Sequence, residues 1–212
     1  MKRAIPITTL FLDIGGVLLT DGWDHHARRR ATKHFNLDWA EMEDRHSLNF
    51  ATYEEGKLSL QDYLSRVVFH EKRRFTRAQF QRFMFSQSTS HPDMLALVVQ
   101  LKSRYGLKVF VVSNEAREIN AFRIRKFRLA GFVDAFISSC FVHIRKPDAD
   151  IFRLSLDIAQ TSAEQVVYID NTPMFVEIAE DLGIRGIRHT DYKSTCAKLA
   201  SVGLHHDEGG GP

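Results

Sequence analysis

Five polar side chains follow three short apolar runs that lie far apart in the chain. They are Asp13 after TTLFL, Ser113 and Asn114 after LKVFVV, and Asp170 and Asn171 after VVYI. Carboxylates can act as nucleophiles or as ligands of Mg²⁺, and a serine hydroxyl beside free backbone N–H groups can hold an anion. Each residue alone is more often a turn or a helix cap, but the set has the residue types that phosphoryl transfer needs.

Lys146 adds a cation to this set. It precedes Pro147 in a polar segment. Beside Asp13 and Asp170, its charge would keep the carboxylates ionised and neutralise a transferring phosphoryl group. Ligands of an open parallel sheet bind beyond the carboxyl ends of the strands. A sheet that brings these ends together would therefore form a site for an anion and for Mg²⁺.

The pattern of apolar residues predicts such a sheet. Runs rich in Val, Ile and Phe, typical of strands buried on both faces, occupy residues 8–14, 107–112, 133–140, 166–169 and 186–189. Segments with helical spacing lie between them, at 93–105, 116–129, 148–159 and 175–182. Alternating strands and helices indicate right-handed crossovers. We therefore predict an α/β fold with a doubly wound, parallel five-stranded sheet.

Residues 21–88 break this alternation. The segment is polar and favours helices at residues 25–35, 39–47, 59–68 and 77–85. We expect an inserted helical cap domain at 21–88, and an α/β core domain built from 1–20 and 89–212. The tail 205–212 (HHDEGGGP) is predicted to be disordered.

Composition excludes several classes of protein. Of the 212 residues 44% are hydrophobic, which suits a globular protein, and the net charge of +3 comes from interleaved charges, so neither nucleic acid nor a membrane is an expected partner. Cys140 and Cys196 have no metal-binding spacing and are expected to be free thiols. With no apolar run of signal-peptide or membrane-spanning length, we expect a cytoplasmic protein, as a monomer or a homodimer.

Taken together, the segments LFLDIGGVL, VFVVSN, RKPDADIF and VVYIDNTP resemble the four motifs of the haloacid dehalogenase (HAD) superfamily, and most closely its capped sugar-phosphate and nucleotide phosphatases. The resemblance implies hydrolysis of a small phosphorylated metabolite, with Asp13 as nucleophile and Mg²⁺ as cofactor. It further implies Mg²⁺ ligation by Asp13, the carbonyl of Gly15, Asp170 and Asn171; phosphate binding by Ser113, Asn114 and Gly16; and neutralisation of charge by Lys146.

The chain departs from the family pattern at two positions. Gly15 stands where many members carry a second aspartate that acts as general acid and base, and Asn171 stands where many carry another aspartate. General acid–base help is worth about 10²–10⁴-fold in rate. We therefore expect slow activity or a replacement acid from the insertion, for which the candidates are Asp21, Asp24, His25 and His26.

Two other functions stay open. A 2-haloacid dehalogenase would use Asp13 on carbon without a metal, but such an enzyme has no need of an acid at Asp170. A catalytically weak, phosphate-binding homologue would fit Gly15 and Asn171, because a protein can keep a fold after its catalytic activity is lost.

Overall fold

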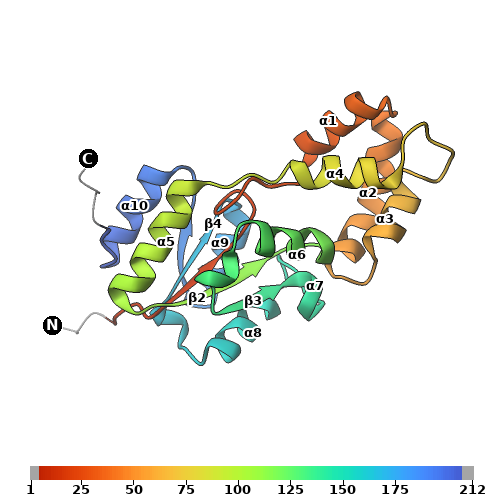
Figure 1. The fold of residues 1–212 in the computed structure, drawn as a ribbon. Helices are drawn as coiled ribbons and strands as arrows, with labels where there is room; N and C mark the ends of the chain where they lie inside the picture. Colours follow the sequence, from red (N-terminus) through yellow and green to blue (C-terminus); the bar gives the residue numbers. More distant parts are fainter. Residues whose placement is uncertain (1–4, 207–212) are drawn as a thin grey trace, which may run out of the picture.

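The computed structural model describes residues 5–206. Its centre is a five-stranded sheet in which all neighbouring strands are parallel, in the order β3-β2-β1-β4-β5. The strands are β1 (Thr9–Leu12), β2 (Lys108–Ser113), β3 (Ala135–Ser138), β4 (Val166–Asp170) and β5 (Arg185–Arg188). Figure 1 shows the sheet with helices on both sides. The predicted doubly wound α/β fold is confirmed.

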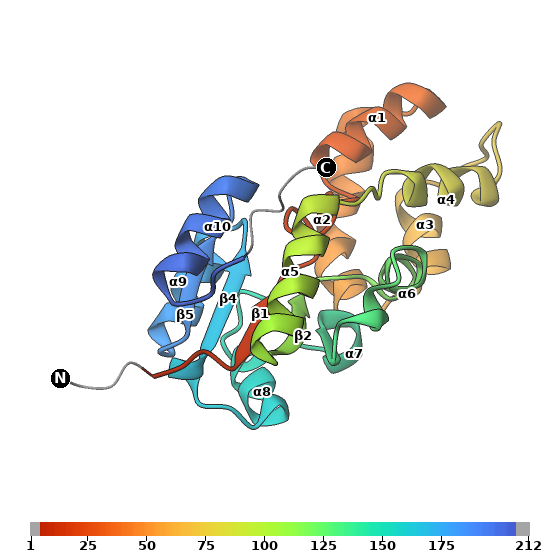
Figure 2. The same ribbon diagram turned by 60° about the vertical axis from the view of Figure 1, so that its left-hand side comes forward.

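Alternating side chains of the strands supply two separate hydrophobic clusters, one on each face. Leu10 and Leu12 point to the face that α5 and α10 cover, whereas Phe11 points to the face that α8 and α9 cover. Figures 1 and 2 show α5 and α10 together on one side of the sheet. The helices of this part are α5 (Pro92–Tyr105), α6 (Arg117–Lys126), α7 (Ser139–Val142), α8 (Asp150–Ala159), α9 (Pro173–Asp181) and α10 (Tyr192–Ser201), with 3-10 turns η1 (Leu129–Gly131) and η2 (Ala163–Gln165). Burial on both faces explains why the strands are almost continuously apolar.

Four further helices form a helical unit with its own hydrophobic cluster. They are α1 (His25–Phe35), α2 (Trp39–Glu54), α3 (Leu60–Val67) and α4 (Arg77–Ser86). Each begins at a capping side chain, Asp24, Asp38, Ser59 or Thr76, that accepts a hydrogen bond from a backbone N–H of the first turn. The helical unit lies beyond one end of the sheet in Figures 1 and 2.

Two linkers join the helical unit to the sheet, and they are held together by hydrogen bonds. The N–H of Thr20 donates to the carbonyl of Thr89 at 2.9 Å, and the N–H of Thr89 donates to the Thr20 hydroxyl at 3.1 Å. Arg123, on α6, donates to the Thr20 carbonyl and the Ser88 hydroxyl, both at 3.0 Å. One buried guanidinium group therefore fixes both linkers.

The structure differs from the predicted elements at several places. The run 133–140 is not one strand, because β3 ends at Ser138 and the chain turns into α7. Helix α10 was not predicted because its buried side has no run of apolar residues. Of its buried positions, Thr195, Cys196 and Leu199, only Leu199 is strongly apolar. Of the predicted disordered tail, 207–212 lies outside the described residues, whereas the N–H of His205 donates to the Tyr105 hydroxyl at 2.9 Å.

Gly22→Ala tests how tightly Arg123 packs against the first linker. Gly22 has φ +74°, and a Cβ there would lie 1.7 Å from a guanidinium nitrogen of Arg123. We expect a loss of about 1–3 kcal/mol from overpacking, in addition to about 1–2 kcal/mol for the left-handed backbone. Gly106→Ala is the matched control, because its φ is +64° and no atom lies within 4 Å of its Cβ. Equal losses of unfolding free energy in the two variants, measured by denaturant titration, would contradict the close packing.

Candidate active site

The residues predicted from the three apolar runs meet at the carboxyl edge of the sheet. Asp13 directly follows β1, Ser113 ends β2 and Asp170 ends β4, and β1 lies between β2 and β4. The chain reverses its winding direction between β1 and β4, which is where open α/β sheets bind ligands. Asp13 and Ser113 line a cavity of about 370 Å³, and further parts of its wall come from the helical unit, α6 and α9.

Lys146 lies between the two aspartates. Its Nζ is 3.0 Å from Asp13 Oδ1, 2.6 Å from Asp170 Oδ2 and 2.9 Å from the Tyr168 hydroxyl. The Tyr168 hydroxyl also donates to Asp170 Oδ2, while Asp170 Oδ1 accepts from the N–H of Thr172 at 2.7 Å. Sequence reasoning missed Tyr168 within an apolar run, although its place two residues before Asp170 puts both side chains on one face of β4.

Two buried carboxylates and one ammonium group leave the cluster with one excess negative charge. Burial, together with the charge of Asp170, raises the pKa of Asp13 to about 7, although the charge of Lys146 and a hydrogen bond from Ser113 act in the opposite direction. The cluster therefore favours either a proton on Asp13 or a cation beside it.

The donor atoms at this edge fit Mg²⁺. Mg²⁺ is usually held by one or two carboxylates with water and other oxygens, and the predicted ligands offer the Asp13 and Asp170 carboxylates, the Gly15 carbonyl and the Asn171 amide oxygen. Within residues 5–206 no group of three or more His, Cys, Asp or Glu side chains is arranged to hold a metal ion. An ion here would therefore depend on carbonyl, amide and water oxygens for the remaining ligands.

The side chains of Ser113 and Asn114 have different surroundings. The Ser113 hydroxyl is buried beside Asp13 and accepts a hydrogen bond from the N–H of Ile14 at 3.4 Å. The Asn114 side chain instead holds the backbone of Lys146, donating to its carbonyl at 2.8 Å and accepting from its N–H at 2.9 Å. Asn114 therefore offers an anion its backbone, while its amide group fixes the Lys146 segment.

Asp21 occupies the space beside Gly15. Its Oδ1 would lie 3.3 Å from a Cβ on Gly15 and 2.8 Å from one on Gly16, and it lies 3.5 Å from Asn171 Nδ2. Partial burial and the nearby charge of Asp24 raise the pKa of Asp21. Among the four predicted replacement acids, Asp21 is thus the one whose carboxylate lies where an aspartate side chain at position 15 would extend.

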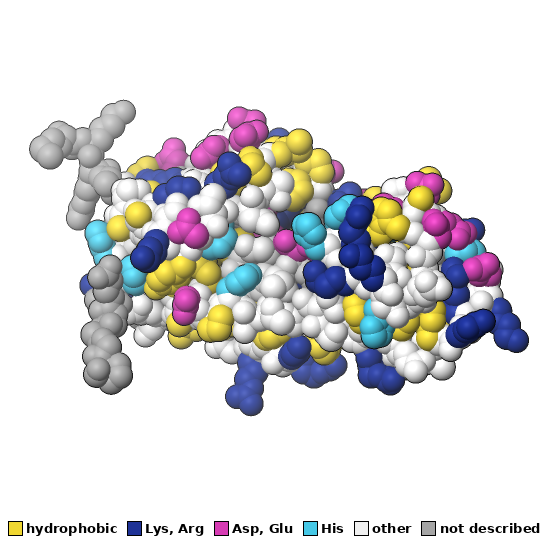
Figure 3. Space-filling view, turned by 90° about the horizontal axis from the view of Figure 1, so that it is seen from above, with side chains coloured by type: hydrophobic (Ala, Val, Ile, Leu, Met, Phe, Trp, Pro, Cys, Tyr) yellow, Lys and Arg dark blue, Asp and Glu magenta, His cyan; other side chains and the backbone are white. Residues whose placement is uncertain are grey.

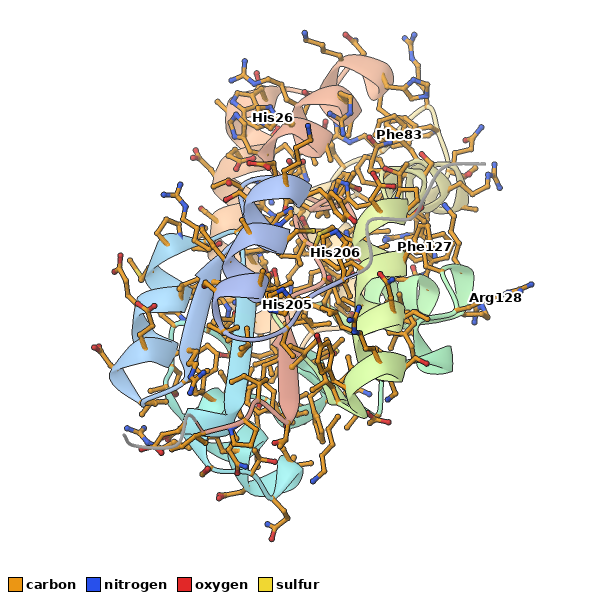
Figure 4. The ribbon with its side chains drawn as sticks, turned by 90° about the vertical axis from the view of Figure 1, so that its left-hand side faces the viewer. His26, Phe83, Phe127, Arg128, His205 and His206 are labelled. Carbon is orange, nitrogen blue, oxygen red and sulfur yellow. The ribbon has the colours of Figure 1, made fainter. Side chains whose placement is uncertain are left out.

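The other three candidates differ in position. Asp24 lines the cavity, but its Oδ1 caps α1 by accepting from the N–H of Ala27 at 2.7 Å. His25 and His26 are exposed and do not line the cavity; the ring of His25 packs against Trp39. Figure 3 shows basic and histidine side chains gathered over α1, and Figure 4 shows His26 there, well away from His205 and His206 between α5 and α10.

Glu115 and Arg123 form a buried ion pair that the sequence did not indicate. Arg123 donates to Glu115 Oε1, and both residues line the cavity. The N–H of Glu115 donates to the Ser139 hydroxyl at 2.9 Å, and that hydroxyl donates to the carbonyl of Glu54 on α2 at 2.7 Å. The loop that carries Ser113 and Asn114 is therefore bonded to the helical unit as well as to the linkers.

Known proteins resemble this chain in sequence and in fold. The model of the haloacid dehalogenase-like hydrolases matches residues 7–183. A sesquiterpene phosphatase of Aspergillus oryzae is 29% identical over 123 residues, which is 56% of this chain and 62% of the relative, so the chain spans less than two thirds of that relative's length.

Solved structures share the fold at lower identity. A HAD family enzyme of Bacteroides thetaiotaomicron, in complex with magnesium and inorganic phosphate, has a TM-score of 0.73 at 20% identity, over 88% of this chain and 97% of the other. The L-2-haloacid dehalogenase of Xanthobacter autotrophicus has a TM-score of 0.62 at 16% identity, over 95% of this chain and 85% of the other.

The raised pKa of Asp13 makes the metal-free protein sensitive to pH. A folded-state pKa of about 7, above the ordinary 3.8, means that the unfolded chain loses this proton at lower pH than the folded protein. The wild type should therefore lose stability relative to Asp13→Asn as pH rises from about 4 to about 7, with the full penalty above pH 7.

Thermal melts of both proteins without metal at pH 5 and pH 8 measure this effect. We expect Asp13→Asn to melt several degrees above the wild type at pH 8 and closer to it at pH 5. Mg²⁺ at pH 8 should raise the melting temperature of the wild type more than that of the variant. A difference between the proteins that is independent of pH would contradict the raised pKa.

Proposed function

We propose that the chain, which belongs to the haloacid dehalogenase-like hydrolase family, is a Mg²⁺-dependent phosphatase that acts on small phosphomonoesters. The observation that carries the proposal is the placement of the Asp13 carboxylate beside Lys146 and Asp170, at the bottom of a cavity that Ser113 also lines. The phosphatase from Aspergillus oryzae and the magnesium–phosphate complex from Bacteroides thetaiotaomicron support the same chemistry.

In the first step, an oxygen of Asp13 attacks phosphorus and forms an aspartyl-phosphate while the bond to the leaving alcohol breaks. The Ser113 hydroxyl and the backbone of Asn114 and Gly16 hold the phosphoryl oxygens. Lys146 neutralises charge that develops between the nucleophile and the phosphoryl group. When bound by Asp13, Asp170, Gly15 and Asn171, Mg²⁺ supplies further neutralisation of the phosphoryl charge.

Asp21 supplies the proton that the leaving alcohol needs. Its position beside Gly15 and its raised pKa suit a group that gives a proton to the alkoxide and then takes one from the attacking water. That water attacks phosphorus in the second step and releases phosphate and a free Asp13. Asp21 therefore takes the role of the aspartate that position 15 lacks.

Residues 21–88 act as a cap that covers the reacting groups and limits the size of the alcohol. Trp23, Phe50 and Tyr53 of this segment line the cavity, and side chains that cover the reacting groups exclude competing water. By size alone, the cavity admits small phosphomonoesters as large as a sugar phosphate or a nucleoside monophosphate. A 2-haloacid dehalogenase is disfavoured, because metal-free attack on carbon has no use for the buried Asp170 carboxylate.

Phosphate release from p-nitrophenyl phosphate and from a panel of small phosphomonoesters tests the proposed function. We expect release that requires Mg²⁺ and that falls to background in Asp13→Asn, since the amide cannot attack phosphorus. Asp148→Asn is a control, because Asp148 is an exposed acid outside the cavity. A folded wild type that releases no phosphate from any ester with Mg²⁺ would overturn the proposal, and chloride release from 2-haloacids would then be measured.

Asp21→Asn tests the proton donor separately. Alkyl phosphates need a proton on the leaving oxygen whereas p-nitrophenolate leaves without one, so kcat/KM should fall by about 10²-fold or more for an alkyl phosphate and far less for p-nitrophenyl phosphate. Gly15→Asp combined with Asp21→Ala should have more alkyl phosphate activity than Asp21→Ala alone, because the truncated side chain leaves space for the new carboxylate. Equal losses for both esters would show that Asp21 does not protonate the leaving group.

A further inference from the structure

We propose, on the basis of the phosphatase function above, that the enzyme selects phosphomonoesters of uncharged, largely apolar alcohols and rejects alcohols that carry a second anionic group. The part of the cavity that receives the alcohol is called the leaving-group subsite here, and it is lined by Trp23, Phe50, Tyr53, Ala116 and Ile119. These aromatic and aliphatic side chains lie beside charged side chains of the same cavity.

A second anionic group would find no free cation in this cavity. The described residues that line the cavity include three cationic side chains, and each is paired with a carboxylate: Arg28 with Glu43, Arg123 with Glu115, and Lys146 with Asp13 and Asp170. An anion brought into the subsite would lose its hydration without gaining a partner, which is strongly unfavourable.

The guanidinium group of Arg28 has a hydrogen-bond acceptor at each of its three nitrogens. Its side chain is 8% exposed. Its Nε and one terminal nitrogen donate to the two oxygens of Glu43, and the other terminal nitrogen donates to the carbonyl of Trp23 at 2.9 Å. Asp21 and Asp24 also line the cavity, so a second anion would meet repulsion as well as the lack of a partner.

Some polar groups beside the apolar side chains of the subsite are already paired. The indole N–H of Trp23 donates to the Tyr63 hydroxyl at 2.9 Å, and Glu54 is paired with Arg145 at 2.7 Å. Among the lining side chains discussed here, the Tyr53 hydroxyl is buried without a hydrogen-bond partner. The Tyr53 hydroxyl can pair with one polar group of an alcohol, whereas hydroxyls of a sugar that face Trp23, Phe50, Ala116 or Ile119 would lack a partner.

Two pairs of esters of matched size test the selectivity. The first pair is 4-carbamoylbenzyl phosphate and 4-carboxybenzyl phosphate, which differ in charge; the second is cyclohexylmethyl phosphate and glucose 6-phosphate, which differ in hydroxyl groups. We expect kcat/KM with Mg²⁺ to be higher for the first member of each pair by about tenfold or more. Ratios near one, or ratios in the opposite direction, would overturn the inference.

Glu43→Gln tests the role of the paired cations. The variant keeps the shape of the side chain but leaves the charge of Arg28 unpaired, so the preference for the carbamoyl ester over the carboxy ester should shrink by about tenfold. Glu41→Gln, which removes an acid on the same helix that pairs with Arg45 instead, is the matched control and should leave the ratio unchanged. An unchanged ratio in Glu43→Gln would contradict the role of charge pairing.

Binding separates this inference from the proposed function. Hydrolysis of p-nitrophenyl phosphate that depends on Asp13 establishes the phosphatase, whatever the two ratios are. If the wild type hydrolyses no ester, calorimetry with 4-carbamoylbenzylphosphonate and 4-carboxybenzylphosphonate in Mg²⁺ still decides the selectivity. Tighter binding of the carbamoyl compound by about tenfold would support it, and equal binding or no binding of both compounds would overturn it.

Discussion

The ammonium group of Lys146 lies between the carboxylates of Asp13 and Asp170, and their charges do not cancel. The excess negative charge is buried, where an unpaired charge is costly, so the surrounding structure has to hold each member in place. Asn114 fixes the backbone of Lys146 from both sides, and Tyr168 donates to Asp170 on the same strand. The parallel pairing of β1 with β4 brings the two aspartates together. A cation at this edge would complete a cluster that the fold alone leaves short of positive charge.

The same edge is connected to the helical unit through Glu115. This residue follows Ser113 and Asn114 in the chain, and its carboxylate holds Arg123, which binds both linkers. Its N–H reaches the carbonyl of Glu54 through the Ser139 hydroxyl. A displacement of the helical unit would therefore disturb bonds to the loop that is proposed to hold phosphate. One connected set of hydrogen bonds therefore holds the proposed cap and the loop that is proposed to hold phosphate.

Much of this arrangement could be predicted from the sequence, because buried strands and the polar residues after them leave a strong local pattern. The five strands, the helical insertion and the meeting of Asp13, Ser113, Lys146 and Asp170 follow from that pattern and from the rule for parallel sheets. Glu115 and Arg123 could not be predicted in the same way. The two residues are eight positions apart, and their pair is important because Arg123 also donates to Thr20 and Ser88. Thr20 and Ser88 are distant in the chain and belong to no periodic pattern. The sequence left four replacement acids open, and the backbone path after β1 distinguishes Asp21 from the others.

The two departures from the family pattern, Gly15 and Asn171, have a common physical explanation. With no side chain at position 15, the carboxylate of Asp21 enters that space, and the Asn171 amide nitrogen lies 3.5 Å from its Oδ1. An aspartate at position 171 would place a second carboxylate against Asp21 and repel it. Asn171 also lies so close to Gly16, which has φ +69°, that a Cβ there would be 2.0 Å from its amide nitrogen. Glycines at positions 15 and 16, an amide at 171 and a carboxylate at 21 are therefore mutually dependent, and a change at one of them has to be judged together with the other three.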